Sequence, residues 1–214
     1  MINIDEIIKI LKYETRNLNK PAMDVIKNPD PYKILISCLL SLRTKDQITI
    51  KATENLFSMV STPKDVIDIE LDEIEKAIKS VNYYKSKAKR IKEISEELVR
   101  KYNGQVPDSF DELIKLKGVG RKTANIVLTH AFGKNTIAVD THVHRISNRI
   151  GIVETKTPEQ TEIELKKKIP IKYWKDYNNL LVAWGQNVCL PIKPKCSTCK
   201  INKFCQRRGV LESR

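Results

Sequence analysis

The sequence predicts an all-α fold. Apolar residues recur at helical spacing, as in "IDEIIKILKYE" and "YYKSKAKRIKEISEELVRKY", whereas alternation typical of strands is hard to find anywhere. Helix-start signals recur as well: Thr62 and Thr157 each precede a proline and a capping-box partner, and Ser109 precedes Glu112 by three residues. These observations indicate a compact bundle of short helices without internal repeats.

Taken in order, the expected helices follow from these periodic stretches and start signals. The segments are about 2–16, 31–41, 45–58, 63–69, 71–79, 84–102, 109–116, 121–132, 141–150, 158–168 and 173–187. The last 26 residues differ in kind, because they hold two prolines, four cysteines, seven Lys or Arg and a single acid, Glu212.

Composition indicates a folded protein with a polyanionic partner. Of 214 residues, 41% are apolar, and 39 Lys and Arg against 26 Asp and Glu leave a net charge of +13. Charge alone leaves nucleic acid and an anionic membrane open. No apolar run reaches the roughly 18 residues of a spanning helix, and the acidic start "MINIDEIIKILKYE" is unlike a signal peptide. We therefore expect a cytosolic protein.

Four of the five cysteines form a motif near the C-terminus. Cys189, Cys196, Cys199 and Cys205 have the spacing Cys-x6-Cys-x2-Cys-x5-Cys within 17 residues. Such crowding in a cytosolic protein favours a structural zinc or a cubane iron–sulfur cluster over disulfides. The fifth, Cys38 in "YKILISCLLSL", is interpreted as a buried small hydrophobe.

The cysteine motif is also basic. Lys193, Lys195, Lys200 and Lys203 lie in it with no acid among them. Surface lysines are commonly only solubilising, but a metal-pinned loop would present its charges in a fixed array, which favours contact with a phosphate backbone. With the charge of the whole chain, we favour DNA contact.

The stretch "LKGVGRKTAN" predicts a helix-hairpin-helix turn. A P-loop is excluded because Arg121 separates Gly120 from Lys122, and a dinucleotide fingerprint is excluded because no strand precedes the glycines. A helix ending near Lys117, a turn through Gly118, Val119 and Gly120, and a helix from Arg121 remain. Unpaired backbone N–H groups at such a turn hold a DNA phosphate, and a Cβ would block the approach.

Lys122 and Asp140 are the candidate chemical groups. Lys122 falls in the first turn of the second helix, where it is either a second phosphate contact or an amine that does chemistry. Asp140, in "VDTHVHRI", precedes a predicted helix, and an N-capping aspartate is the ordinary interpretation. His142 and His144 have no ligand cluster near them, so we expect them to pack or to face solvent.

Three motifs together, "LKGVGRKTANIVL", "AVDTHVHRISNRIG" and the cysteine motif, closely resemble the endonuclease III family of DNA base-excision glycosylases. The resemblance covers nearly the full chain in the right order. It implies a two-lobed helix-hairpin-helix glycosylase fold that grips double-stranded DNA and flips the damaged base out of the stack. Residues 22–133 would form a six-helix lobe with the hairpin at about 109–132, and residues 1–21 with 134–214 the second lobe.

The resemblance also implies the cofactor and the chemistry. The four cysteines would hold a structural [4Fe-4S] cluster in the loop 189–205. Lys122 matches the family's nucleophile and Asp140 its catalytic carboxylate. Adenine-mismatch relatives lack the lysine and thymine-mismatch relatives commonly carry tyrosine, so Lys122 favours the bifunctional branch, which removes oxidised or ring-saturated pyrimidines and cuts the strand by β-elimination through a Schiff base.

Some residues depart from the family pattern. Lys117 replaces a common proline, and "LLSLRTKD" stands where many members read "LLSAQATD", so Leu42 or Arg43 would fill the gap left by the flipped base. Tyr83 aligns with an apolar wedge residue, and an aromatic ring could stack there. A monofunctional mismatch glycosylase and a non-enzymatic DNA-binding protein stay as alternatives. We expect a monomer that binds duplex DNA containing damaged bases or abasic sites and that does not bind a membrane.

Overall fold

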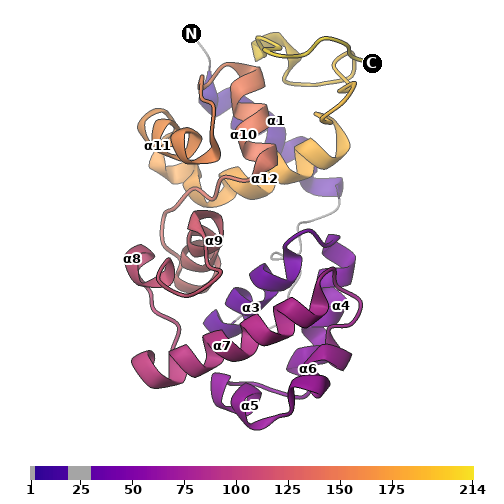
Figure 1. The fold of residues 1–214 in the computed structure, drawn as a ribbon. Coiled ribbons are helices and arrows are strands. Elements are labelled where there is room, and N and C mark those ends of the chain that lie inside the picture. Colours follow the sequence, from indigo (N-terminus) through magenta and orange to yellow (C-terminus); the bar gives the residue numbers. More distant parts are fainter. Residues whose placement is uncertain (1–2, 19–29) are drawn as a thin grey trace. The chain divides into compact units, whose positions relative to one another are not determined.

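The computed structural model describes residues 3–18 and 30–214, and within them it is entirely helical, with no strand. The predicted all-α class is confirmed. The chain divides into two compact units, one formed by Ala22–Lys134 and the other by Met1–Pro21 with Asn135–Arg214 (Figure 1). None of the described helices is long and apolar enough to cross a membrane.

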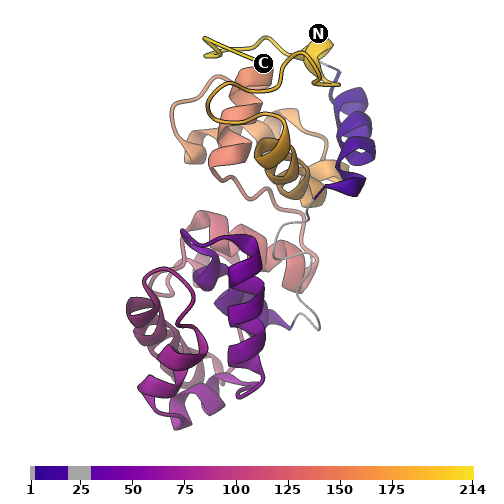
Figure 2. The same ribbon diagram turned by 90° about the vertical axis from the view of Figure 1, so that its right-hand side faces the viewer.

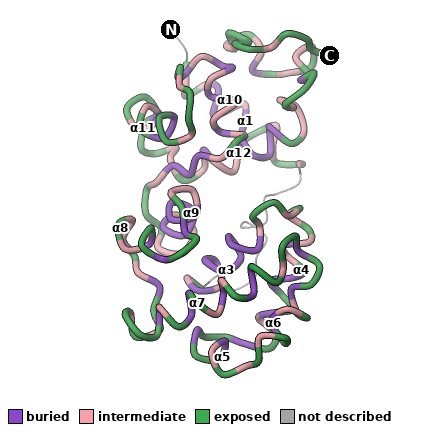
Figure 3. Tube along the Cα trace, viewed as in Figure 1, coloured by how far each residue is buried: buried purple, intermediate pink, exposed green. Residues whose placement is uncertain are grey.

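The continuous unit is organised around one buried helix. Its helix α3 packs against α4, α7 and α9. All side chains from Tyr32 to Leu40 except that of Lys33 are buried (Figure 3). This explains why the stretch is apolar on every side rather than on one stripe. The helices are α3 (Pro31–Ser41), α4 (Asp46–Phe57), α5 (Pro63–Asp68), α6 (Leu71–Ala77), α7 (Tyr84–Tyr102), α8 (Phe110–Leu113) and α9 (Arg121–Phe132).

The second unit joins the two ends of the chain. Its first helix, α1, buries Ile7, Ile8 and Leu11 in a core shared with residues from Ile137 to Ile201 (Figures 1 and 2). The helix α12 lies along this core and buries Tyr177 and Trp184. The elements are α1 (Ile4–Glu14), η1 (Thr15–Asn17), α10 (Thr141–Ile150), α11 (Pro158–Lys168), η2 (Ile171–Tyr173), α12 (Trp174–Asn187) and η3 (Asn202–Phe204).

All three predicted helix starts carry the expected cap. Thr62 forms a complete capping box with Asp65, because each side chain accepts from the backbone N–H of the other. Thr157 and Ser109 each accept the backbone N–H three residues on. Their partners turn elsewhere: Gln160 accepts from the N–H of Lys156, and Glu112 accepts from the Tyr102 hydroxyl.

Several predicted helices exceed the observed ones by one or two residues, and two differ by more. The helix expected over 109–116 ends at Leu113 and continues as tight turns, with Leu116 N–H donating to Leu113 O and Val119 N–H to Leu116 O. The helix expected over 2–16 begins at Ile4 because the Asn3 side chain caps it at Glu6 N–H. Residue 2 and the expected lobe boundary at residues 21 and 22 lie outside the described residues.

Candidate active site

The glycine turn joins α8 to α9 in the continuous unit. Gly118 has φ +89°, a left-handed value that favours glycine, and an added Cβ would come within 3.0 Å of the Arg90 side chain. Gly120 has an ordinary φ of −94°, and an added Cβ would meet nothing within 4 Å. Val119 anchors the turn, because its side chain is buried and its N–H donates to Leu116 O at 3.0 Å. Gly118 is therefore needed for the backbone conformation of the turn, whereas Gly120 faces open space.

The start of α9 carries the two basic residues of the motif. Gly120 is its N-cap, and a glycine has no side chain that could accept the first backbone N–H groups of the helix. The Arg121 guanidinium lies over the Phe110 ring of α8 at 4.7 Å from its centroid, which ties the two helices of the hairpin together. The N-terminal end of α9 therefore keeps the positive pole of a helix dipole at an exposed turn.

Lys122 lies where α9 packs against α3. Its side chain is half-buried, and the side chain of Cys38 on α3 is only 2% exposed. Burial raises the pKa of the Cys38 thiol to about 12, and the positive charge of Lys122 acts in the opposite direction. The amine is therefore within electrostatic reach of a neutral, buried thiol. The interpretation of Cys38 as a buried small hydrophobe is confirmed.

Asp140 begins α10 in the other unit. Its Oδ1 accepts the backbone N–H groups of His142 and Val143, both at 2.9 Å, and its Oδ2 lies 3.3 Å from His142 Nδ1. The side chain is 12% exposed. The capping role predicted for Asp140 is therefore observed, and the three contacts hold the carboxylate in one orientation.

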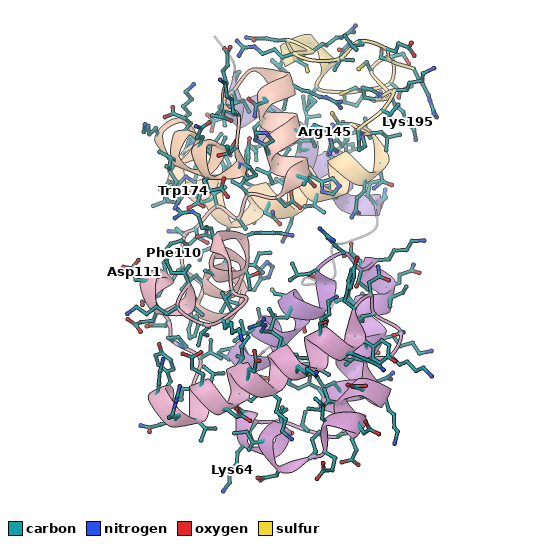
Figure 4. All side chains as sticks on the ribbon, in the orientation of Figure 1. Lys64, Phe110, Asp111, Arg145, Trp174 and Lys195 are labelled. Carbon is teal, nitrogen blue, oxygen red and sulfur yellow. The ribbon has the colours of Figure 1, made fainter. Side chains whose placement is uncertain are left out.

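Arg145 connects this helix to the cysteine loop, and sequence reasoning missed it. It extends from α10 and donates from Nη2 to the carbonyls of Gly185 and Cys189, at 3.2 and 2.9 Å (Figure 4). Burial lowers the pKa of its guanidinium, while the charge of Asp140 acts to raise it. Nothing in a single sequence marks this residue, because its partners lie 40 and 44 positions away.

The four cysteines of the motif line one pocket. Cys189, Cys196, Cys199 and Cys205 surround it together with apolar side chains, among them Ile146, Ile150, Trp184 and Ile201. Burial raises the pKa of Cys199 to about 11. Their side chains are not at ligand geometry: among the described residues, no group of three or more His, Cys, Asp or Glu could hold a metal ion.

Donor groups nevertheless point at the sulfur atoms. Arg149 Nη1 lies 3.5 Å from Cys189 Sγ, and Arg207 N–H donates to Cys205 Sγ at 3.4 Å. Arg149 is 8% exposed, and it also donates to the carbonyls of Leu190 and Pro191 at 2.6 and 2.7 Å. This buried arginine therefore fixes the first turn of the loop, a role that the sequence did not reveal. The donor set fits thiolates, which accept such hydrogen bonds.

Two of the four lysines of the loop are paired with acids from outside the motif. Lys193 forms an ion pair with Glu212 at 2.8 Å, and Lys203 one with Glu6 at 2.8 Å. The absence of acids within the motif therefore did not mean an absence of acids around it. Lys195 is exposed beside the pocket, and Figure 4 shows it on the loop after α12.

The candidate gap-filling and wedge residues lie on two exposed turns of the continuous unit. Leu42, directly after α3, is 44% exposed, and Tyr83, directly before α7, is 64% exposed. Arg43 and Tyr83 have φ values of 55° and 59°, in the left-handed region. Asn82 joins the two turns, because its side chain donates to Arg43 O and its N–H donates to Thr44 Oγ1 at 3.3 Å.

Comparisons with known proteins agree with this arrangement. Residues 36–171 match the family model described as HhH-GPD superfamily base excision DNA repair protein. The chain is 49% identical over 191 residues to endonuclease III of Thermotoga maritima, covering 88% of this chain and 90% of that protein. The chain belongs to the endonuclease III family.

Solved structures of DNA repair enzymes share the fold. A trapped endonuclease III–DNA covalent intermediate, in an estranged-adenine complex, aligns with a TM-score of 0.84 at 34% identity over 97% of both chains. A thermostable thymine-DNA glycosylase aligns with a TM-score of 0.81 at 28% identity over 92% of both chains. The predicted helix-hairpin-helix glycosylase fold is confirmed.

Proposed function

We propose that the protein is a bifunctional DNA glycosylase of base-excision repair, which removes a damaged base and then cleaves the strand. The observation that carries this is the half-buried Lys122 in the first turn of α9, next to an uncapped glycine turn, in a chain 49% identical to an endonuclease III. The substrates are duplex DNA with oxidised or ring-saturated pyrimidines, or with abasic sites. The protein acts as a monomer in the cytoplasm.

The two units hold DNA through fixed positive groups. The N–H groups at the start of α9 hold one phosphate, which reaches them past Gly118 and Gly120. Arg121 stabilises the turn through its contact with the Phe110 ring. Lys195 and Lys193 extend the basic surface of the cysteine loop, although Lys193 shares its charge with Glu212. Such contacts position the strand without reading its sequence.

Lys122 supplies the nucleophile. Its neutral amine attacks C1′ of the damaged nucleotide while the bond from C1′ to the base breaks and the base leaves with a proton. The sugar ring opens to a protonated Schiff base. Loss of a proton from C2′ then expels the 3′ phosphate, and hydrolysis of the imine returns the free lysine.

Asp140 stabilises the charge that this reaction develops. Its carboxylate is held by two backbone N–H groups and His142, so it needs no reorganisation as positive charge appears on the sugar. The carboxylate also accepts and returns protons during elimination. The N-cap and the catalytic role use the same fixed orientation.

A borohydride trap tests the nucleophile. Borohydride added during reaction with a thymine-glycol duplex reduces the Schiff base, so the wild type should form a stable covalent complex and Lys122→Gln none. Lys115→Gln is a matched control, because Lys115 is an exposed lysine of the same hairpin. Trapping that persists in Lys122→Gln would refute the assignment.

Two further assays distinguish the alternatives. A monofunctional mismatch glycosylase would release thymine or uracil from mismatches and leave the strand intact until heated with alkali. A non-enzymatic DNA-binding protein would bind an abasic duplex without nicking it. Lys122 argues against the first alternative, because mismatch relatives lack a lysine or commonly carry tyrosine at this position.

We further propose that Cys189, Cys196, Cys199 and Cys205 hold a [4Fe-4S] cluster. The support is the thiol set around one pocket, together with the hydrogen-bond donors from Arg149 and Arg207. The cluster would fix the loop, and no step of the reaction passes through it. A brown protein with absorbance near about 410 nm, lost in Cys199→Ser, would support iron–sulfur over zinc.

A further inference from the structure

Lys87 is a buried lysine that the proposed mechanism does not use. It lies in the second turn of α7 and is 9% exposed. Its Nζ donates to the carbonyls of Leu40 and Leu42, both at 2.7 Å, and to Thr44 Oγ1 at 3.1 Å. All three donors of the ammonium therefore have an acceptor in the segment that ends α3 and follows it.

This segment and the start of α7 form one hydrogen-bonded unit. Thr44 Oγ1 accepts both from Lys87 Nζ and from the backbone N–H of Asn82, and the Asn82 side chain donates to Arg43 O. The backbone N–H of Lys87 donates to Tyr83 O at 3.0 Å. Lys87 is thus bonded to both turns, one through its side chain and one through its backbone.

The two turns need such a constraint. Arg43 and Tyr83 both have left-handed φ values, which side chains other than glycine adopt only at a free-energy cost and which persist where surrounding contacts fix them. The three exposed side chains Leu42, Arg43 and Tyr83 sit on these turns. Without the contacts of Lys87 and Asn82, the turns would relax and the side chains would separate.

A simple helix end does not require a buried lysine. Water or a glycine in the position after the helix satisfies the last carbonyls of most helices. Burying an ammonium is unfavourable, and here burial lowers the pKa of Lys87 to about 8. A lysine that stays buried despite this is explained by the geometry it fixes rather than by stability.

We propose that Lys87 is a positioning residue that holds the turn at Leu42 and Arg43 against the turn at Tyr83, so that the three side chains meet the duplex as one preformed set. The inference rests on the proposed function and on the expectation from the family resemblance that Leu42 or Arg43 fills the gap left by the flipped base while Tyr83 stacks as a wedge. Preformed side chains reduce the ordering that binding and base flipping require.

The test compares two substrates. Base excision from a thymine-glycol duplex requires a paired base to be flipped and its space filled, whereas strand cleavage at an abasic site in a single-stranded oligonucleotide requires neither. We expect Lys87→Met to slow single-turnover excision from the duplex by about 10-fold and to leave single-strand cleavage within about 2-fold of wild type. A 2-aminopurine placed opposite the lesion should show a correspondingly slower fluorescence rise.

Lys85→Met is the matched control. It removes the same charge from an exposed position on the same helix, two residues away, and should leave both rates unchanged. Asn82→Ala releases the Arg43 turn from the solvent side, where little is buried, and should slow duplex excision in the same direction by a smaller factor. It tests the inference even if Lys87→Met does not fold.

The outcomes separate the two proposals. Duplex excision at the wild-type rate in both Lys87→Met and Asn82→Ala overturns the positioning role alone, as does an equal loss on both substrates, which would indicate a purely structural role. A wild type that cleaves neither substrate overturns the proposed function and this inference with it.

Discussion

The helices α9 and α10 carry the two proposed catalytic residues, and they begin in opposite ways. At α9 the N-cap is Gly120, which has no side chain to accept a backbone N–H group. At α10 the N-cap is Asp140, and one carboxylate oxygen takes the N–H groups of two successive residues. Both starts have the positive pole of a helix dipole, but only at α10 does a carboxylate of the protein itself, that of Asp140, bind to it.

The two helix starts can serve different purposes. In the proposed function, the glycine start of α9 holds an external phosphate through its backbone, and Lys122 follows on the same helix. At α10 the start binds an internal anion, so a carboxylate is fixed in place before any substrate arrives. We therefore expect Gly120 substitutions at the start of α9 to change DNA binding, and Asp140 substitutions to change the excision rate and, where the cap is also lost, stability.

The largest effect is expected at Asp140. Asparagine caps a helix about as well as aspartate, so Asp140→Asn should leave the melting temperature nearly unchanged while it removes the charge. We expect single-turnover excision to fall by about 10²- to 10³-fold. Asp140→Ala should add a loss of about 1 kcal/mol in unfolding free energy.

Thr157→Ala is the control for capping alone. Thr157 caps α11 and has no proposed catalytic role, so its loss should lower the unfolding free energy by about 1 kcal/mol at an unchanged excision rate. An Asp140→Asn variant that excises bases at the wild-type rate would show that Asp140 acts only as the N-cap of α10.

Substitution of the two glycines of the turn should have different effects, one on stability and the other on DNA binding. Gly118→Ala forces a left-handed φ on alanine and a contact with Arg90, so we expect the unfolding free energy to fall by about 1–2 kcal/mol. Gly120→Ala meets neither problem and should stay within about 0.5 kcal/mol, yet weaken duplex binding by about 10-fold. Urea unfolding and fluorescence anisotropy measure the two effects, and equal binding by Gly120→Ala and wild type would count against the phosphate site.

The C-terminal end of α3 extends the comparison to the negative pole of a helix, where Lys87 lies. Burial lowers the pKa of Lys87 from 10.5 to about 8, so between these values the unfolded chain binds more protons than the folded one. Folded-state stability therefore rises with pH across this window. We expect the unfolding free energy of wild type relative to Lys87→Met to increase by about 2–3 kcal/mol from pH 8 to pH 10.5. A difference independent of pH would contradict the lowered pKa.

The smallest effect is expected at Cys38, which lies near Lys122. Because burial raises its pKa to about 12, the thiol stays neutral at the pH values where the enzyme is assayed. The profile of excision rate against pH should therefore coincide for wild type and Cys38→Ala between about pH 6 and pH 9. A shifted profile would show that the thiol, and not only the helix start, influences the amine.

Local signals predicted much of the fold. Thr62 and Thr157 mark their helix starts because cap, proline and partner are all within four residues. The family motifs also placed Lys122 and Asp140 at the helix starts where the structure has them. The roles of these two residues stay predictions, since position alone does not establish chemistry.

What the sequence did not reveal depends on distant partners. Arg145 and Arg149 acquire their roles from carbonyls some 40 residues away, and Lys193 is paired by Glu212 from beyond the motif. The left-handed backbone at Tyr83 is likewise invisible locally, because tyrosine carries no preference for it.

The helix α1 has a consequence for synthesis of the chain. It leaves the ribosome long before the residues that cover Ile7, Ile8 and Leu11, because these lie between Ile137 and Ile201. The unit of residues 22–134 is one continuous stretch, so all of it is synthesised while the apolar residues of α1 are still exposed. Nascent α1 is therefore the segment of this protein that a chaperone has most time to bind.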